Sequence, residues 1–106
     1  MTYKLTVRPF QMGNDKEAAV KVLEEASEAR EACQALYACE ALESSTCRLD
    51  MYPNVKQADC QLYIDLADEL ADVIHAACNL ADRYEIDLQA AMERCERRNR
   101  ERGRYE

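Results

Sequence analysis

Apolar residues recur at helical spacing most regularly in the second half of the chain. They follow one another by four and three residues in alternation, at Leu66, Leu70, Val73, Ala77, Leu80 and Tyr84. This alternation places them all along one face of an α-helix, as in the seam of a helical bundle. The pattern predicts a helix over residues 60–84 that packs along this seam.

Another helix is predicted closer to the N-terminus. No glycine or proline interrupts residues 14–52, and Asn14 or Asp15 can cap a helix whose first turn contains acids. We expect this helix to run from about 15 to 43. The residues before it, 1–13, are β-branched in places and include a proline and a glycine. They are expected to form an extended arm.

The rest of the chain predicts a connection and a last helix. Residues 44–59 contain the serine, threonine, aspartate, proline and asparagine that are typical of a connection. Asp87 is a suitable N-cap for a helix from about 88 to 102, which Gly103 would end. Residues 1–106 are therefore interpreted as one all-α domain. We expect a helical bundle completed by oligomerisation, because so short a chain leaves apolar stripes uncovered.

Composition supports this interpretation, and charge restricts the partners. The chain is 48% hydrophobic and 33% charged, with only two glycines and two prolines, which favours a compact helical protein. Its net charge is -7, although residues 94–104 alone hold six arginines and two glutamates. The remainder is thus strongly acidic, so it repels nucleic acid and attracts cations. Arginines near the end of a helix also complement its dipole, and we do not expect nucleic-acid binding.

Nothing in the sequence predicts a membrane segment or a disulfide framework. No stretch approaches the roughly 20 apolar residues of a membrane span, and the N-terminus lacks the apolar core of a secretory signal. We therefore expect a soluble cytoplasmic protein whose six cysteines are reduced. With no CxxC pair and one histidine, a zinc site of the usual kind is not expected.

Two pairs of acidic residues occupy matching positions on the predicted helices. If Val22 is the centre of the first apolar stripe, Glu25 falls about 60° to one side and Glu28 about 120° to the same side. On the second helix, Glu69 and Asp72 have the same two offsets from the seam. Antiparallel packing of the helices would bring the pairs together beside the core.

Four converging carboxylates repel one another, and such a group usually persists because a cation occupies it. Oxygen ligands without histidine or thiol suit Mg²⁺, or Mn²⁺. The alternative is that the acids lie on solvated helix flanks and form ordinary ion pairs, such as Glu25 with Arg30. Spacing alone leaves both interpretations open.

The same acids lie in motifs that resemble those of a known family. Residues 24–28 fit the pattern EExxE, residues 69–72 fit ExxD, and the last predicted helix ends with Asn99 and Arg102. In this order the motifs resemble those of the MazG-like all-α nucleoside triphosphate pyrophosphohydrolases. The resemblance covers about two thirds of the chain.

The resemblance implies a helical bundle that assembles as a dimer or a dimer of dimers. It implies hydrolysis of a (deoxy)nucleoside triphosphate to monophosphate and pyrophosphate with Mg²⁺. The implied metal ligands are Glu25, Glu28, Glu69 and Asp72. Glu24 would orient or deprotonate the attacking water. The implied substrate-binding residues are Arg94, Arg98, Asn99 and Arg102.

Three departures from the family pattern stand out. The gap between the acidic motifs is longer than usual, which makes residues 44–59 an inserted connection. Cys95 stands where many members carry a phosphate-binding lysine, so Arg94 or Arg98 would have to replace it. The tryptophan with which some members sandwich a base is absent, because the chain has no tryptophan.

Two other functions fit part of the pattern. Phosphoribosyl-ATP pyrophosphohydrolase of histidine biosynthesis has a similar size and related acidic motifs, although the ending with asparagine and arginine fits the MazG-like family better. A non-catalytic helical adaptor or regulator could keep the fold without the activity, and Cys95 favours it. Intact EExxE and ExxD motifs favour the enzyme.

Overall fold

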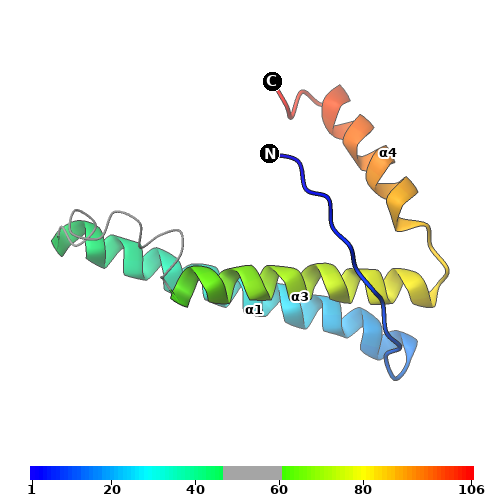
Figure 1. Ribbon diagram of the computed structural model, residues 1–106, viewed down its shortest axis with the longest axis horizontal. Helices are drawn as coiled ribbons and strands as arrows, with labels where there is room; N and C mark the ends of the chain where they lie inside the picture. The colour runs from blue at the N-terminus through cyan, green and yellow to red at the C-terminus, as the bar shows by residue number, and fades with distance from the viewer. Residues whose placement is uncertain (47–60) are drawn as a thin grey trace.

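The structure is a computed structural model that describes residues 1–46 and 61–106, except for the side chains of residues 39–46. The described part contains three α-helices and no strand, which confirms the all-α prediction. The helices are α1 (Asp15–Thr46), α3 (Gln61–Arg83) and α4 (Leu88–Glu101) (Figure 1). The predicted connection over 44–59 lies, from residue 47 on, outside the described residues.

α1 begins where the sequence predicts. The side chain of Asn14 accepts a hydrogen bond of 2.8 Å from the backbone N–H of Glu17, so Asn14 is the N-cap. Asp15 is left free for another partner and forms an ion pair with Arg83 at the end of α3. This pair joins the start of α1 to the end of α3, and the two helices lie antiparallel, side by side (Figure 1).

α4 also has the predicted ends. Asp87 caps it by accepting a hydrogen bond of 3.0 Å from the backbone N–H of Ala90. At the other end Gly103 has a φ of +72°, and two backbone bonds close the helix. The Gly103 N–H donates to the Arg100 carbonyl at 3.1 Å, and the Arg104 N–H donates to the Asn99 carbonyl at 2.9 Å. These bonds form a Schellman motif.

α3 ends with the same motif at a residue that is not glycine. Glu85 has a φ of +54°, in the left-handed region. Its N–H donates to the Asp82 carbonyl at 3.1 Å, and the Ile86 N–H donates to the Ala81 carbonyl at 2.9 Å. The turn between α3 and α4 therefore holds a conformation that costs a side-chain-bearing residue about 1 kcal/mol.

The buried residues of the helix pair are mainly small, and the predicted seam is covered only in part. The buried apolar residues are Ala18, Ala29, Leu36, Ala76 and Ala81. By contrast, Leu70 of the predicted seam is 49% exposed and Tyr84 is 56% exposed. The prediction of the packed face of this helix was thus wrong in part. Part of the apolar seam of α3 stays open to solvent.

The chain is extended for its length. Its principal dimensions are 50 × 38 × 21 Å, and α4 points away from the pair formed by α1 and α3 (Figure 1). The N-terminal arm is extended, as predicted, and crosses α3 before it enters α1. Among the described residues, no helix has both the length and the apolar character needed to cross a membrane.

Candidate functional site

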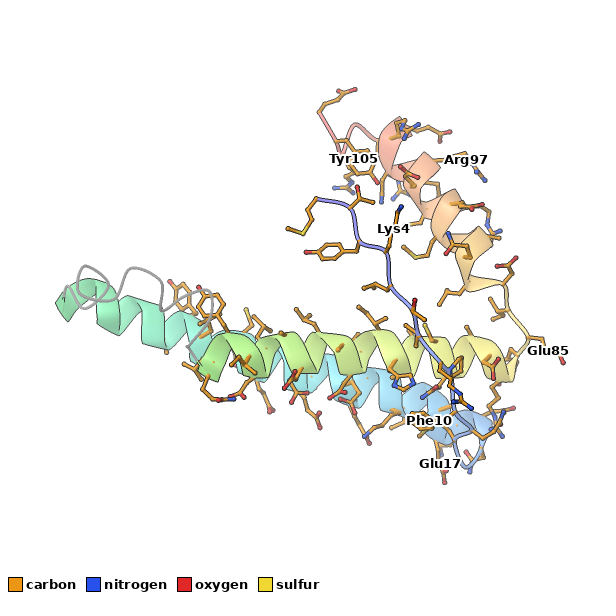
Figure 2. All side chains as sticks on the ribbon, in the orientation of Figure 1. Lys4, Phe10, Glu17, Glu85, Arg97 and Tyr105 are labelled. Carbon is orange, nitrogen blue, oxygen red and sulfur yellow. The ribbon has the colours of Figure 1, made fainter. Side chains whose placement is uncertain are left out.

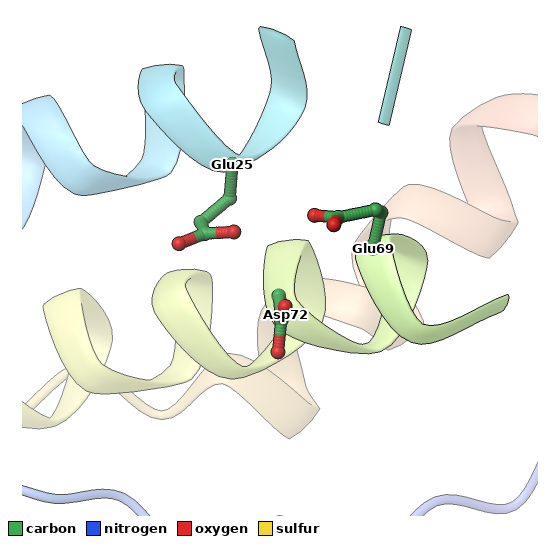
Figure 3. Close-up of side chains that lie close together, drawn as sticks. All are labelled: Glu25, Glu69 and Asp72. Carbon is green, nitrogen blue, oxygen red and sulfur yellow. The ribbon is translucent and has the colours of Figure 1, made fainter. Parts of the chain in front are cut away.

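Three carboxylates from α1 and α3 converge in the middle of the helix pair. Glu25, Glu69 and Asp72 each offer one oxygen, and these oxygens all lie within 4.8 Å of one another. Figure 3 shows Glu25 projecting from α1 toward α3, where the carboxylate of Glu69 turns toward it. The antiparallel packing therefore brings together acids from both predicted motifs.

Glu25 lies inside the helix contact, not at its edge. Its residue surface is only 7% exposed. Ala18, Ala29 and Leu36 are also buried, and with Glu25 they follow heptad spacing along one face of α1. The expected stripe centred on Val22 was wrong in part: Ala29 and Leu36 are buried, but Val22 is only half-buried, and the buried face is turned toward Glu25. A carboxylate therefore occupies a position where bundles normally place an apolar side chain.

Two oxygens of this group have no hydrogen-bond partner. They are Oε2 of Glu25 and Oε2 of Glu69, and both are inaccessible to water within the described part of the chain. A buried polar atom without a partner costs free energy, and a charged one costs more. The pair of orphaned oxygens is therefore the feature of this site that packing alone does not explain.

Lys21 supplies the positive charge of the site. Its Nζ lies 2.9 Å from Oε1 of Glu25 and 3.8 Å from Oε2 of Glu24. The hydrogen bond from Lys21 lowers the pKa of Glu25 and outweighs the opposing effect of burial. The same bond raises the pKa of Lys21. Lys21 was not predicted from the sequence, although its position four residues before Glu25 is a recognised spacing for helical ion pairs.

Glu28 lies next to the three-oxygen group. The pKa of Glu28 is raised. The largest cause is Glu25, through a hydrogen bond and through charge repulsion, followed by burial and then by a hydrogen bond and repulsion from Glu69. Glu28 thus faces acids of both helices, although its own residue surface is exposed. The neighbouring acids thus make ionisation of the Glu28 carboxyl less favourable.

The geometry fits a small divalent cation. Two ligands on opposite sides of Mg²⁺ are about 4.2 Å apart, since each Mg–O distance is about 2.1 Å. The three oxygens are within 4.8 Å of one another, so modest side-chain movements would bring them onto one ion. The donors are carboxylate oxygens only, a set that suits Mg²⁺ or Mn²⁺ better than Zn²⁺. The residues present therefore fit the expected metal.

Two cavities open on either side of the carboxylates. One, of about 330 Å³, has five acids in its wall: Glu28, Glu31, Asp65, Asp68 and Glu69. The other, of about 160 Å³, lies under the N-terminal arm and is partly lined by Glu25 and Asp72. The first is too acidic to hold an anion without added cations. The second combines aromatic, amide and basic side chains.

The structure does not bring the expected substrate-binding residues to this site within one chain. Arg94, Arg98, Asn99 and Arg102 all belong to α4 or its C-cap, and α4 makes little contact with α1 or α3. The amide of Asn99 instead donates to Sγ of Cys95 on the previous turn, at 3.6 Å. Glu24, the expected catalytic base, is exposed and lies outside the three-oxygen group.

Sequence reasoning also missed the contribution of the N-terminal arm. The arm reaches the site through Phe10, whose backbone N–H donates to Oδ1 of Asn79 at 2.8 Å. Asn79 is 5% exposed, an unusual burial for an asparagine. Its position between apolar residues of α3 was the only sequence signal for this contact.

Searches of protein-family models, of curated proteins and of solved structures found no match to this chain. The resemblance to the MazG-like family therefore rests on the motifs themselves.

Proposed function

We propose that this protein is a Mg²⁺-dependent pyrophosphohydrolase that cleaves a (deoxy)nucleoside triphosphate to monophosphate and pyrophosphate. The observation that carries the proposal is the convergence of the carboxylates of Glu25, Glu69 and Asp72. Glu25 and Glu69 each have one buried oxygen without a hydrogen-bond partner. A scaffold gains nothing from such a group, whereas a cation site requires it. The order of the EExxE and ExxD motifs supports the choice of reaction.

In this proposal the acids of both helices hold the metal. Glu25, Glu69 and Asp72 would bind it directly, and Glu28, which lies beside them, would join them. Bound Mg²⁺ supplies charge neutralisation on the phosphates and a lowered pKa for water. Glu24, one turn from Glu28 on the solvent side, would orient the attacking water or accept its proton.

The leaving pyrophosphate needs positive charge that the acidic helix pair lacks. Arg94, Arg98 and Arg102, with Asn99, would supply it from α4. α4 stands away from the acids of its own chain, so we propose that a second copy brings its α4 to this site. The sharing of one site between copies explains why the arginines and the acids are separated within a chain.

The dimensions of the chain support this association. Its accessible surface is 8650 Å², whereas a compact monomer of its mass exposes roughly 6100 Å². Its radius of gyration is 17.4 Å, against about 13 Å for a compact chain of this length. The uncovered surface includes Leu23, Tyr37, Leu70, Ile74 and Met92. Light scattering at micromolar concentration should give the mass of a dimer or a dimer of dimers, and a monomeric mass would refute the shared site.

A non-catalytic adaptor remains the competing proposal. It is favoured by the distance between α4 and the acids, and by the absence of a lysine at Cys95. The two proposals agree on the fold and on association, and they differ only in turnover. A measurement of pyrophosphate release therefore separates them.

The decisive experiment is a substrate screen with matched variants. All standard ribo- and deoxyribonucleoside triphosphates, together with phosphoribosyl-ATP, are tested for pyrophosphate release with Mg²⁺. Glu69→Gln should abolish release because it removes one metal ligand while keeping the side-chain shape. Glu93→Gln removes the same charge from the exposed surface of α4 and should leave release unchanged. Release that survives in Glu69→Gln, or no release from any substrate, would refute the proposal.

A further inference from the structure

The first residues of the N-terminal arm have the sequence pattern of a β-strand. From Thr2 to Arg8 the chain reads TYKLTVR, in which large apolar side chains alternate with polar ones. Alternation with a period of two places Tyr3, Leu5 and Val7 on one face of an extended chain and the polar side chains on the other. Aromatic and β-branched residues also favour strands. The segment therefore has the composition of a strand that pairs with another strand.

The structure leaves this segment without a strand partner. The arm is extended, and Figure 2 follows it from Phe10, beside α3, to Lys4, which lies away from both α1 and α3. Within the described part of the chain, no main-chain hydrogen bond joins residues 1–9 to another main-chain group. Tyr3 is 74% exposed and Leu5 is 61% exposed. Large apolar side chains and a row of polar main-chain groups are thus available to a partner.

The anchored end of the arm determines which edge of the strand is open. The Phe10 N–H donates to Oδ1 of Asn79 at 2.8 Å, and the Arg8 carbonyl oxygen lies 2.9 Å from Nε2 of His75. In an extended chain the N–H and C=O of one residue point to the same edge, and those of the next residue point to the opposite edge. The even-numbered residues at this end turn their main-chain groups toward α3, so the odd-numbered residues present the open edge.

We propose that residues 2–8 form a two-stranded antiparallel β-ribbon with the same residues of a second copy of this chain. Antiparallel pairing of a segment with itself has two-fold symmetry, so the contact closes after two copies. The ribbon ends at Pro9, which has no N–H to donate. The proposal goes beyond the proposed function, because the pairing requires neither a metal nor a nucleotide.

One register of this ribbon keeps side chains of the same kind together. It places Leu5 opposite Leu5 of the second copy, so that Tyr3 lies opposite the second copy's Val7. Among the polar residues, Lys4 lies opposite the second copy's Thr6. The apolar side chains then share one face of the ribbon, and the polar side chains share the other. Aromatic and β-branched residues directly opposite each other also stabilise a strand pair.

The neighbouring registers are opposed by charge or by the pattern of apolar residues. A shift of two residues in one direction places Lys4 opposite Lys4, and a shift in the other direction places Lys4 opposite Arg8. Like charges directly opposite each other destabilise a strand pair. A shift of one residue would mix apolar and polar side chains on both faces. The register centred on Leu5 avoids both penalties.

Hydrogen exchange of the full-length protein, followed by NMR, tests the pairing residue by residue. In the register centred on Leu5, the N–H groups of Tyr3, Leu5 and Val7 donate to carbonyls of the second copy. The N–H groups of Lys4 and Thr6 point to the other edge. Exchange should therefore be at least about tenfold slower at the odd-numbered residues than at the even-numbered ones.

A sample that mixes isotope-labelled with unlabelled chains shows which chain supplies the partner strand. Nuclear Overhauser effects between Tyr3 and Val7 should connect different chains, because the two side chains lie opposite each other across the ribbon. Fast exchange at all of the arm amides would leave this edge to a different protein and would overturn the proposal. Contacts confined to one chain would overturn it as well.

Substitutions of charge test the register. Thr6→Lys places a lysine opposite Lys4 at two symmetric positions and should speed exchange at Leu5 by about fivefold. The addition of Lys4→Glu to this variant makes both pairs attractive and should restore slow exchange. Gln11→Lys adds the same charge to the exposed arm beyond Pro9 and should change nothing. Equal exchange at Leu5 in Thr6→Lys and Gln11→Lys would refute the ribbon in this register.

Discussion

The carboxylate group predicts that divalent cations stabilise this protein at one identifiable site. Without a cation, Glu25 and Glu69 keep buried oxygens unpaired, and their charges repel each other. A cation that binds the folded state relieves both effects and is released on unfolding, when the two helices separate. The melting temperature should therefore rise with Mn²⁺ or Mg²⁺, and Glu69→Gln should remove most of this rise.

The size of the effect follows from linkage. A free cation concentration ten times the dissociation constant stabilises the folded state by about 1.4 kcal/mol. For a domain of about 100 residues, 1 kcal/mol corresponds to roughly 4–8 °C in melting temperature. The wild type should thus gain roughly 6–11 °C under these conditions. Glu69→Gln keeps two of the three direct ligands, so its dissociation constant should rise and its gain should be much smaller.

Differential scanning calorimetry at fixed protein concentration measures this gain, because association also affects the melting temperature. Glu93→Gln changes the net charge equally on exposed α4 and should gain as much as the wild type. In the absence of metal, Glu69→Gln should melt no lower than the wild type, since it removes one of the crowded charges. If Mn²⁺ stabilises Glu69→Gln as much as the wild type, the ion binds elsewhere and the reasoning fails.

Three further predictions concern charge and backbone conformation. Lys21→Met should raise the affinity for Mn²⁺ in calorimetric titrations, because Lys21 competes with the ion for Glu25. It should also lower the melting temperature without metal, because the charge of Glu25 is then no longer neutralised; unchanged Mn²⁺ affinity would contradict the competition. In the folded protein without metal, the pKa of Glu28 is raised above its usual value of 4.5. Glu28 therefore contributes stability at low pH, and this contribution is lost as the pH rises through the raised pKa. Between pH 4 and pH 7, the melting temperature of the wild type should therefore fall relative to that of Glu28→Gln, whereas the affinity of the wild type for Mn²⁺ should rise. If the melting temperatures of the two proteins change equally with pH, Glu28 does not titrate in this range. Glu85→Gly should raise the free energy of unfolding in urea by about 1 kcal/mol, because glycine tolerates the positive φ of that turn, and no gain would mean that the turn is unstrained.

The ends of the helices could be predicted because their signals are local. Asn14, Asp87 and Gly103 each act through bonds to residues at most five positions away, and the sequence contains all the partners. The buried face of α1 could not be predicted in this way. Alanines lie on several sides of this helix, so its apolar pattern does not distinguish a face that contains Val22 from one that contains Glu25. The packing of α3 makes that choice.

The acids of the site could be predicted because the antiparallel pairing of α1 and α3 could be predicted. Glu25, Glu69 and Asp72 could be found because each pair lies within four residues and because antiparallel packing is the usual arrangement of two adjacent long helices. The arm could not be found, since Phe10 and Asn79 are separated by 69 positions and neither belongs to a periodic pattern. Contacts of this kind depend on the finished fold, and no local rule of sequence specifies them.

The burial of Glu25 gives the strongest reason to regard this region as functional. An alanine or leucine in its place would complete the apolar line formed by Ala18, Ala29 and Leu36, and it would leave no orphaned oxygen. Lys21 reduces the cost by pairing with Oε1 but leaves Oε2 without a partner. Lys21 thus balances part of the charge of Glu25, while Oε2 of Glu25 stays unpaired beside the carboxylates of Glu69 and Asp72. Local departures from good packing that are balanced only in part are expected where a protein binds something.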